Sequence, residues 1–471
     1  MRKKRTLLTI FVMIILAIVM LSGCATQVVN YVDDPEDDSP IRIYVLSDRV
    51  KGFIDYLDNL IYSDFQNGFN YSHDYRLRVT CFEDADTMYT QILDEMFKGG
   101  GPDIIVINSL SGRYLNVDKL TPQNAFADLD ILLENNGNID LNDYNTEVMD
   151  TGIIHGKRVI LPVGYNVNYT VGIQECFDEH NLEAPKEMSM TSYLDTLEEY
   201  YKKSSLSPAM LGIEESYLIS QFFEMGGELE KSDELRRLLD VLKIEHQRNA
   251  NMVMHDLRSA DFPKRFIDEH GWFYDNGLLF MDQTGQRYMT TRRFHLHYNT
   301  IETYWGRNMV WFPQPFREDH PVEAYVEHGF AINNNSKHKN EAFEFIELVL
   351  SETRQFTAHV MHYPVRLDAY QKELEVFTKG LNLSYPDYWG IGGAGYPHPD
   401  YIPDEKFLPT KMADEFLDYV TSPEKYTFMG HFDYIYYNVM EPSIKDYYKG
   451  HMSFDALVEE INDKLVIYYS E

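Results

Sequence analysis

The stretch DIIVIN, residues 103–108, decides the fold class. Its four central residues, Ile104 to Ile107, are all β-branched and apolar. A short run of this kind is typical of a strand buried on both faces of a parallel sheet. The segment GGGP at residues 99–102 stands directly before it, and glycine and proline end a preceding helix. We therefore predict a central strand of an α/β sheet at residues 103–108.

The segments before this strand alternate between strand and helix patterns. Residues 41–46 (IRIYVL) are a short β-rich run, and residues 76–82 alternate apolar with polar side chains. From residue 85 to residue 96, apolar residues recur at the spacing of one helix face, and Asp84 is placed to cap that helix. The predicted order is βαβαβ, which gives an α/β fold with helices on both faces of the sheet.

Polar residues follow the ends of two of these strands. Ser47 and Asp48 come after the first strand, and Asn108 and Ser109 come after the third. In such folds, ligands bind beyond the carboxyl ends of the strands, so these four residues are candidates to bind one. Asp48 is also suited to the N-terminus of the next helix, and Asn108 to capping the next turn. Both alternatives stay open.

The first 23 residues have the pattern of a secretory signal peptide. Basic residues at positions 2–5 precede an uncharged, mostly apolar run at positions 6–20. Small residues and then an acidic stretch follow this run, so we predict cleavage. The alternative is an uncleaved N-terminal anchor, which would need about 20 apolar residues to cross a bilayer.

The segment LSGC, residues 21–24, resembles the lipobox of bacterial lipoproteins. In such a motif the Cys24 thiol is acylated and becomes the first residue of the mature chain. Two acyl chains hold a protein on a membrane stably where one does not. Residues 24–40 then contain five acidic residues and little to bury, so we predict a flexible acidic tether. The expected location is the extracellular side of the cell membrane, or the periplasmic side where an outer membrane exists.

The composition limits size and partners. The chain has 471 residues, which suggests two or three domains or one large bilobed one. It has 42 Lys and Arg against 75 Asp and Glu, so nucleic acids and anionic lipid surfaces are disfavoured as partners. Two cysteines, Cys81 and Cys176, remain after Cys24. An extracellular setting permits a disulfide between them, but the sequence leaves the pairing open.

Further segments, taken in chain order, resemble the extracellular solute-binding proteins of ABC importers, in the branch of maltose- and oligosaccharide-binding proteins. GKRVILPVGY, residues 156–165, is similar to the segment in which the chain of that family first crosses between lobes. MVWFP, residues 309–313, is similar to the return crossing. The order of the similar segments carries the resemblance, and they lie at residues 101–106, 126–129, 156–165, 277–281, 309–313, 329–332, 336–350 and 448–465.

This resemblance implies a periplasmic-binding-protein-like α/β fold with two lobes, a hinge and a ligand cleft between the lobes. We expect one lobe at residues 41–163 and 313–352, and the other at residues 164–312 and 353–471. Proteins of this kind bind a ligand and pass it on, so no catalytic residue, metal or cofactor is expected, and a monomer is the expected state.

The resemblance also implies candidate ligand residues. Asp48 and Arg49 occupy the place of an acidic-basic pair in sugar-binding relatives, and Tyr165 and Asn166 stand just past the first crossing. Sugar recognition combines stacked aromatic rings with planar polar groups, so tryptophans matter. An exposed loop position is the alternative for Tyr165, Asn166 and Gln283, and a buried hinge position is the alternative for Trp311. The remaining candidates from the resemblance are Gln283, Trp311, Tyr388 and Trp389, of which Trp389 is the best placed to stack.

The predicted function is a lipid-anchored subunit that captures a mono- or oligosaccharide and delivers it to a membrane permease. Two alternatives are a sensor or adhesin lipoprotein and an extracellular glycan-degrading enzyme. Gly390, Gly392 and Gly395 match a dinucleotide-binding pattern, but prolines follow them where a helix would have to begin, so we regard the match as accidental.

Overall fold

A computed structural model describes residues 40–48, 52–53, 56–73, 75–108, 110–136, 138–185, 189–203, 215–251, 280–281, 298, 302, 308–317, 322–357, 362–379 and 409–470. The chain divides into residues 1–40 and residues 41–471, and all the elements below belong to the second unit. Within the described ranges, no helix combines the length and the apolar character needed to cross a membrane. Cys81 is exposed, Cys176 is buried, and the two form no disulfide with each other.

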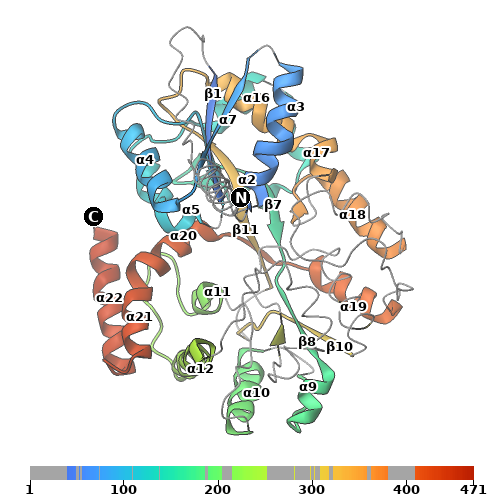
Figure 1. Ribbon diagram of the computed structural model, residues 1–471, viewed down its shortest axis with the longest axis vertical. Coiled ribbons are helices and arrows are strands. Elements are labelled where there is room, and N and C mark those ends of the chain that lie inside the picture. The colour runs from blue at the N-terminus through green and yellow to red at the C-terminus, as the bar shows by residue number, and fades with distance from the viewer. Residues whose placement is uncertain are drawn as a thin grey trace, which may run out of the picture. The chain divides into compact units, whose positions relative to one another are not determined.

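The larger sheet has eight strands (Figure 1). β1 (Ile41–Asp48) runs parallel to β3 (Leu77–Phe82) on one side and to β4 (Ile104–Ile107) on the other. β11 (Glu323–Ile332) lies antiparallel between β4 and β7 (Leu161–Asn166). Three short strands complete the sheet: β2 (Gly52–Phe53), β12 (Tyr363–Pro364) and β13 (Lys425–Phe428). All four residues of β4 are buried, as its sequence predicted.

Helices accompany this sheet in the predicted order. Asp84 caps α4 (Ala85–Phe97) by accepting a hydrogen bond of 2.7 Å from the Thr87 amide. The buried face of α4 carries Met88, Tyr89, Ile92 and Met96, which confirms the predicted helix face. The other helices are α2 (Tyr56–Leu60), η1 (Ile61–Phe65), α3 (Gln66–Ser72), α5 (Ser111–Tyr114), α6 (Val117–Leu120), α7 (Leu129–Asn136), η2 (Leu141–Asp143), α8 (Thr146–Asp150), α16 (Lys339–Leu350), α17 (Glu352–Thr357) and α18 (Leu367–Lys379).

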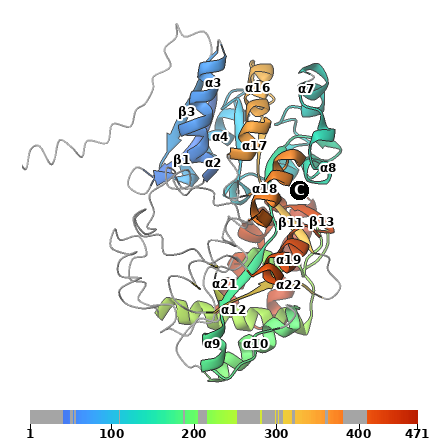
Figure 2. The ribbon, with the colours of Figure 1, turned by 90° about the vertical axis from the view of Figure 1, so that its right-hand side faces the viewer.

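A smaller sheet of three antiparallel strands has β8 (Tyr169–Ile173) in its centre. β10 (Met309–Pro313) pairs with one edge of β8 and β9 (Phe280–Met281) with the other. Figures 1 and 2 both show α9 (Gln174–Glu179), α10 (Met190–Lys203) and α12 (Asp233–Asn251) at the end of the unit where β8 lies. A separate hairpin is formed by β5 (Ile153–Ile154) and β6 (Lys157–Arg158), and the helix α11 (Glu215–Ser220) precedes α12.

Three described segments connect the two sheets. Residues 167–168 join β7 to β8, and residues 314–322 join β10 to β11. The third pass is α19 (Thr410–Val420), whose Phe416 packs on Trp311 and Tyr169 of the small sheet and which leads into β13 of the large sheet. The larger sheet thus draws strands from residues 41–48 and from residues 425–428. The proposed boundaries of the two lobes stay a prediction.

Four helices end the chain, namely α20 (Met429–Ile435), η5 (Tyr436–Met440), α21 (Glu441–Tyr448) and α22 (Phe454–Ser470). α5 packs closely against α20, because a Cβ at Gly112 would lie 2.9 Å from the Cβ of Asp433. The hydroxyl of Ser453 accepts a hydrogen bond of 3.3 Å from the Ala456 amide at the start of α22.

One edge of the large sheet is covered by side-chain amides. The Ile41 amide donates a hydrogen bond to the Arg76 carbonyl, so the even-numbered residues of this segment bond to β1. In a parallel pair, the backbone groups of the residues between them point away from the partner strand. The amide and carbonyl of Leu77 therefore face the open edge of the sheet. The Asn70 Oδ1 accepts a hydrogen bond of 2.6 Å from the Leu77 amide, and Gln66 Nε2 donates to the Leu77 carbonyl at 3.2 Å. Such covering protects an open strand edge from pairing with another chain.

We expect Asn70→Ala to lower the free energy of unfolding by about 1–2 kcal/mol, because the inward-packed Leu77 would lose the partner of its amide. Urea unfolding followed by circular dichroism would measure the change. Asn135→Ala is the matched control, since Asn135 is an exposed helical asparagine and its loss should change stability by less than about 0.5 kcal/mol. Equal effects of the two substitutions would contradict the covering function of Asn70.

Candidate ligand-binding site

Neutral polar side chains are buried where the chain passes between the sheets. Asn168, Thr170, Gln314 and Tyr325 are each at most 3% exposed. Among the described residues, the Asn168 Nδ2 and the Thr170 Oγ1 have no hydrogen-bond partner. The Tyr325 hydroxyl interacts with the side chains of Gln314 and Glu323. Each buried polar group left unpaired costs about 1–3 kcal/mol. The cluster therefore supplies neutral donors and acceptors suited to a polar ligand.

Tyrosine hydroxyls in this region stay protonated. Burial raises the pKa of Tyr325 well above its ordinary value, and the nearby Glu323 carboxylate raises it further. Burial also raises the pKa of Tyr363 well above the ordinary value and that of Tyr370 to about 12. These phenols therefore remain neutral hydrogen-bonding groups at physiological pH.

Two buried histidines lie beside the first pass. His362 Nδ1 lies 3.0 Å from the Asn166 Oδ1, and the rings of His328 and His362 are 4.2 Å apart. Because a carbonyl oxygen only accepts, His362 donates its Nδ1 proton to Asn166. This hydrogen bond fixes the orientation of the Asn166 amide at the end of β7.

Asn108 follows β4 and organises the turn into α5. Its Oδ1 accepts hydrogen bonds from the amides of Leu110 at 3.1 Å and Ser111 at 2.9 Å, and from the Tyr89 hydroxyl at 3.3 Å. Asn108 therefore has the turn-capping function that the sequence left open. Its buried Nδ2 has no partner among the described residues, so both of its N–H donors remain for a ligand.

The structure brings some predicted ligand residues near the passes between the sheets. Tyr165 is 3% exposed and packs against the rings of Tyr363, Tyr370 and Tyr426. Burial raises its pKa well above the ordinary value. Asn166 follows it in β7, and Trp311 of β10 is half-buried, with its ring 5.9 Å from that of Tyr419. Their part in ligand binding stays a prediction.

The other predicted residues are less informative. Asp48 is the last residue of β1 and pairs with Gly52 of β2. Asn108 directly follows β4, and β11 separates that strand from β7. The predicted residues that fall outside the described part of the chain are Cys24, Arg49, Ser109, Gln283, Tyr388 and Trp389.

The sequence analysis missed Thr170, Gln314, His328 and His362. A signal for three of them exists, because each interrupts or directly follows an apolar, strand-like run. Thr170 stands inside residues 169–173, Gln314 directly follows residues 309–313, and His328 stands in the run before Phe330. A polar residue in such a position is a candidate for a buried, functional contact.

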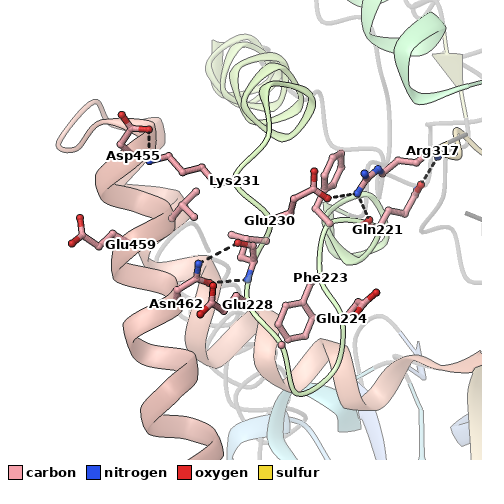
Figure 3. Close-up of a pocket in the computed structure, with 14 residues that line it drawn as sticks. Gln221, Phe223, Glu224, Glu228, Glu230, Lys231, Arg317, Asp455, Glu459 and Asn462 are labelled. Atoms are coloured by element: carbon pink, nitrogen blue, oxygen red, sulfur yellow. Dashed lines mark hydrogen bonds and ion pairs between the residues drawn. The ribbon is translucent and has the colours of Figure 1, made fainter. Parts of the chain in front are cut away.

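A separate hollow of about 630 Å³ lies between residues 221–231 and α22 (Figure 3). Acidic side chains dominate its lining, and two of them are paired: Glu230 with Arg317, and Asp455 with Lys231. Asn462 closes one wall by accepting a hydrogen bond of 2.7 Å from the Leu229 amide (Figure 3). Arg317, in the connection from β10 to β11, contributes to the wall of this hollow. Within the described ranges, no group of three or more His, Cys, Asp or Glu side chains could hold a metal ion.

No family model and no curated protein matches the chain. Solved structures do match it along most of its length. A proposed oligosaccharide-binding periplasmic protein from Synechococcus is 14% identical, with 91% of this chain and 99% of that chain covered and a TM-score of 0.58. An ABC substrate-binding protein from Listeria monocytogenes, in complex with cycloalternan, is 13% identical over 92% and 99% of the two chains, with a TM-score of 0.57.

CpMnBP1 with mannobiose bound is 14% identical over 91% of this chain and 100% of its own, with a TM-score of 0.57. Matches that cover almost the whole of each neighbour show a shared fold, although the identities are low. The predicted α/β fold class is thereby confirmed. The chain has the periplasmic-binding-protein-like fold of the extracellular solute-binding proteins, as the order of its sequence segments predicted.

Proposed function

We propose that this protein binds a carbohydrate outside the cytoplasm and delivers it to the permease of an ABC transporter. The observation that carries the proposal is the near-complete fold match to proteins described as binding oligosaccharides, cycloalternan and mannobiose. The neutral polar cluster of Asn168, Thr170, Gln314 and Tyr325 supports it, because amides and hydroxyls pair with the hydroxyls of a sugar.

The proposed mechanism is capture without breaking a bond. The ligand would be held between the sheets, near the buried amide of Asn108 and the polar cluster, and two stacking rings, Tyr388 and Trp389, would cover its apolar face. Closure about the passes between the sheets would then enclose the ligand. A micromolar dissociation constant corresponds to about −8 kcal/mol, which a few enclosed hydrogen bonds and stacked rings supply.

We further propose that lipid on Cys24 holds the protein on the outer side of the cell membrane and that residues 24–40 act as its tether. The anchor keeps a monomeric capture protein near its permease. Neighbours described as periplasmic or as ABC substrate-binding proteins support this extracellular location.

Calorimetric titration tests the proposal. The purified protein should bind at least one member of a panel of mono- and oligosaccharides, including mannobiose and maltotriose, with a micromolar dissociation constant and a raised melting temperature. Peptides and polyamines are the competing ligand classes. If no sugar binds and a peptide or polyamine does, the sugar assignment is wrong, although a capture function would survive.

Two alternative functions give different results. Incubation with polysaccharide followed by measurement of new reducing ends would reveal a glycan-degrading enzyme, because a capture protein leaves its ligand intact. A sensor or adhesin would bind sugar without supporting its uptake. Deletion of the gene should therefore abolish uptake of the bound sugar if the transport proposal is correct.

A further inference from the structure

The hydroxyl of Tyr419 joins two segments that pass between the sheets. It donates a hydrogen bond of 2.6 Å to the Asn168 carbonyl, in the connection from β7 to β8. It also accepts a hydrogen bond of 3.2 Å from the Gln314 amide, in the connection from β10 to β11. This phenol therefore bridges the backbones of Asn168 and Gln314, which are far apart in sequence.

Tyr419 itself belongs to the third pass. It lies near the end of α19, six residues before Lys425 begins β13 of the large sheet, and the Glu424 amide between them donates to the Val322 carbonyl at 2.9 Å. The ring of Tyr419 lies 5.9 Å from that of Trp311 on the small sheet. One side chain is therefore linked to all three connections.

The bridge is buried. Tyr419 is 8% exposed, and Asn168 and Gln314 are 3% and 0% exposed. Burial raises the pKa of Tyr419 well above its ordinary value, so the phenol keeps the proton that it donates. Removing the hydroxyl would leave a backbone amide and a backbone carbonyl buried without their partner, and such groups rearrange to recover a hydrogen bond.

We propose that Tyr419 is a positioning residue for ligand capture: its hydroxyl makes the three connections move together, and so sets the relative orientation of the two sheets. The expected effect on ligand affinity rests on the proposed function. The coupling itself concerns the protein without ligand. If the connections moved independently, the sheets would sample a broader range of orientations, and a ligand that contacts both would bind more weakly.

The test measures, in the protein without ligand, the distance between a helix beside the large sheet and a helix beside the small sheet. Spin labels would be placed at Tyr71 of α3 and at Lys202 of α10, both exposed, in the full chain carrying Cys24→Ala and Cys81→Ser. Double electron–electron resonance should give one narrow distance distribution. In Tyr419→Phe, which keeps the ring and removes only the hydroxyl, the distribution should widen about twofold or shift to a new maximum.

Tyr144→Phe is the matched control. Tyr144 is also a buried tyrosine, and its hydroxyl donates a hydrogen bond of 2.9 Å to a backbone carbonyl, that of Leu350, at the larger sheet's helices. Both variants should lose similar stability, but only Tyr419→Phe should change the distance distribution. An unchanged distribution in Tyr419→Phe, with stability lowered as in Tyr144→Phe, would overturn the inference.

Two further measurements make a failure of the coupling distinguishable from a failure of the sugar proposal. In the unsubstituted protein, hydrogen exchange at the Gln314 backbone amide should be slow, and this amide should exchange together with those of residues 167–169. Fast, independent exchange at Gln314 would overturn the coupling. This measurement needs no variant, so it decides the question even if Tyr419→Phe fails to fold. Titration with mannobiose should show an affinity lowered about tenfold in Tyr419→Phe and unchanged in Tyr144→Phe. If mannobiose binds neither the variant nor the unsubstituted protein, the result counts against the sugar proposal. The distance distribution still decides whether the connections are coupled.

Discussion

Gly152→Ala is expected to destabilise the protein by about 3 kcal/mol or more, because the new methyl group has no space. A Cβ at residue 152 would lie 2.0 Å from the Ile160 carbonyl oxygen and 2.8 Å from its carbonyl carbon. Both atoms belong to the backbone, so no side-chain rotation relieves the clash. The Gly152 carbonyl also accepts hydrogen bonds from the amides of Val159 and Ile160, which a shift of the backbone would break.

The effect should reach the large sheet, since Ile160 directly precedes β7. Urea unfolding would measure the loss of stability, and reduced accumulation of folded protein would accompany it. Gly100→Ala is the control, because a Cβ there would lie 3.7 Å from the Glu95 carbonyl oxygen, an ordinary contact. Its expected change is within about 0.5 kcal/mol. A Gly152→Ala protein as stable as Gly100→Ala would show that the turn at residues 152–160 adjusts freely.

Cys24→Ala is expected to move almost all of the protein from the membrane fraction into the medium, or into the periplasm where an outer membrane exists. The reason is that acylation requires the thiol, and without two acyl chains the protein loses its stable hold on the membrane. The released protein should stay folded and still bind sugar, while uptake of that sugar by the cells should be lost. Cell fractionation and incorporation of labelled palmitate would measure the change.

Cys81→Ala provides the control for this experiment. It removes an exposed thiol of the folded unit and should leave the protein in the membrane fraction with its palmitate label. Retention of Cys24→Ala on the membrane would mean that residues 1–23 are an uncleaved anchor and that the lipobox interpretation is wrong.

The sequence predicted the first part of the large sheet well because its signals are local. Residues 41–46, 76–82 and 103–108 correspond to β1, β3 and β4, and all three run in the same direction. The predicted helix after Asp84 ends within one residue of α4. In each case the hydrophobic period and the adjacent glycine, proline or capping residue lie within a few positions of the element that they determine.

The polar cluster between the sheets could not be predicted in the same way. Tyr419 meets Asn168 across 251 positions and Gln314 across 105, and His362 meets Asn166 across 196. No local pattern connects such residues, because the tertiary fold alone brings them together. The sequence also gave no reason to distinguish Tyr419 from the other 34 tyrosines. Resemblance to a family placed the two crossings, but it did not identify the side chain that joins them.

The position of β11 has a consequence for how the chain matures. This strand fills the gap between β4 and β7, yet it lies more than 150 residues after β7 in the sequence, and β13 joins it only at residues 425–428. The core of the large sheet is therefore incomplete until most of the polypeptide has been synthesised, and folding must wait for contacts of large sequence separation. An export machinery that threads unfolded chains through a membrane would meet this protein before its sheet could close.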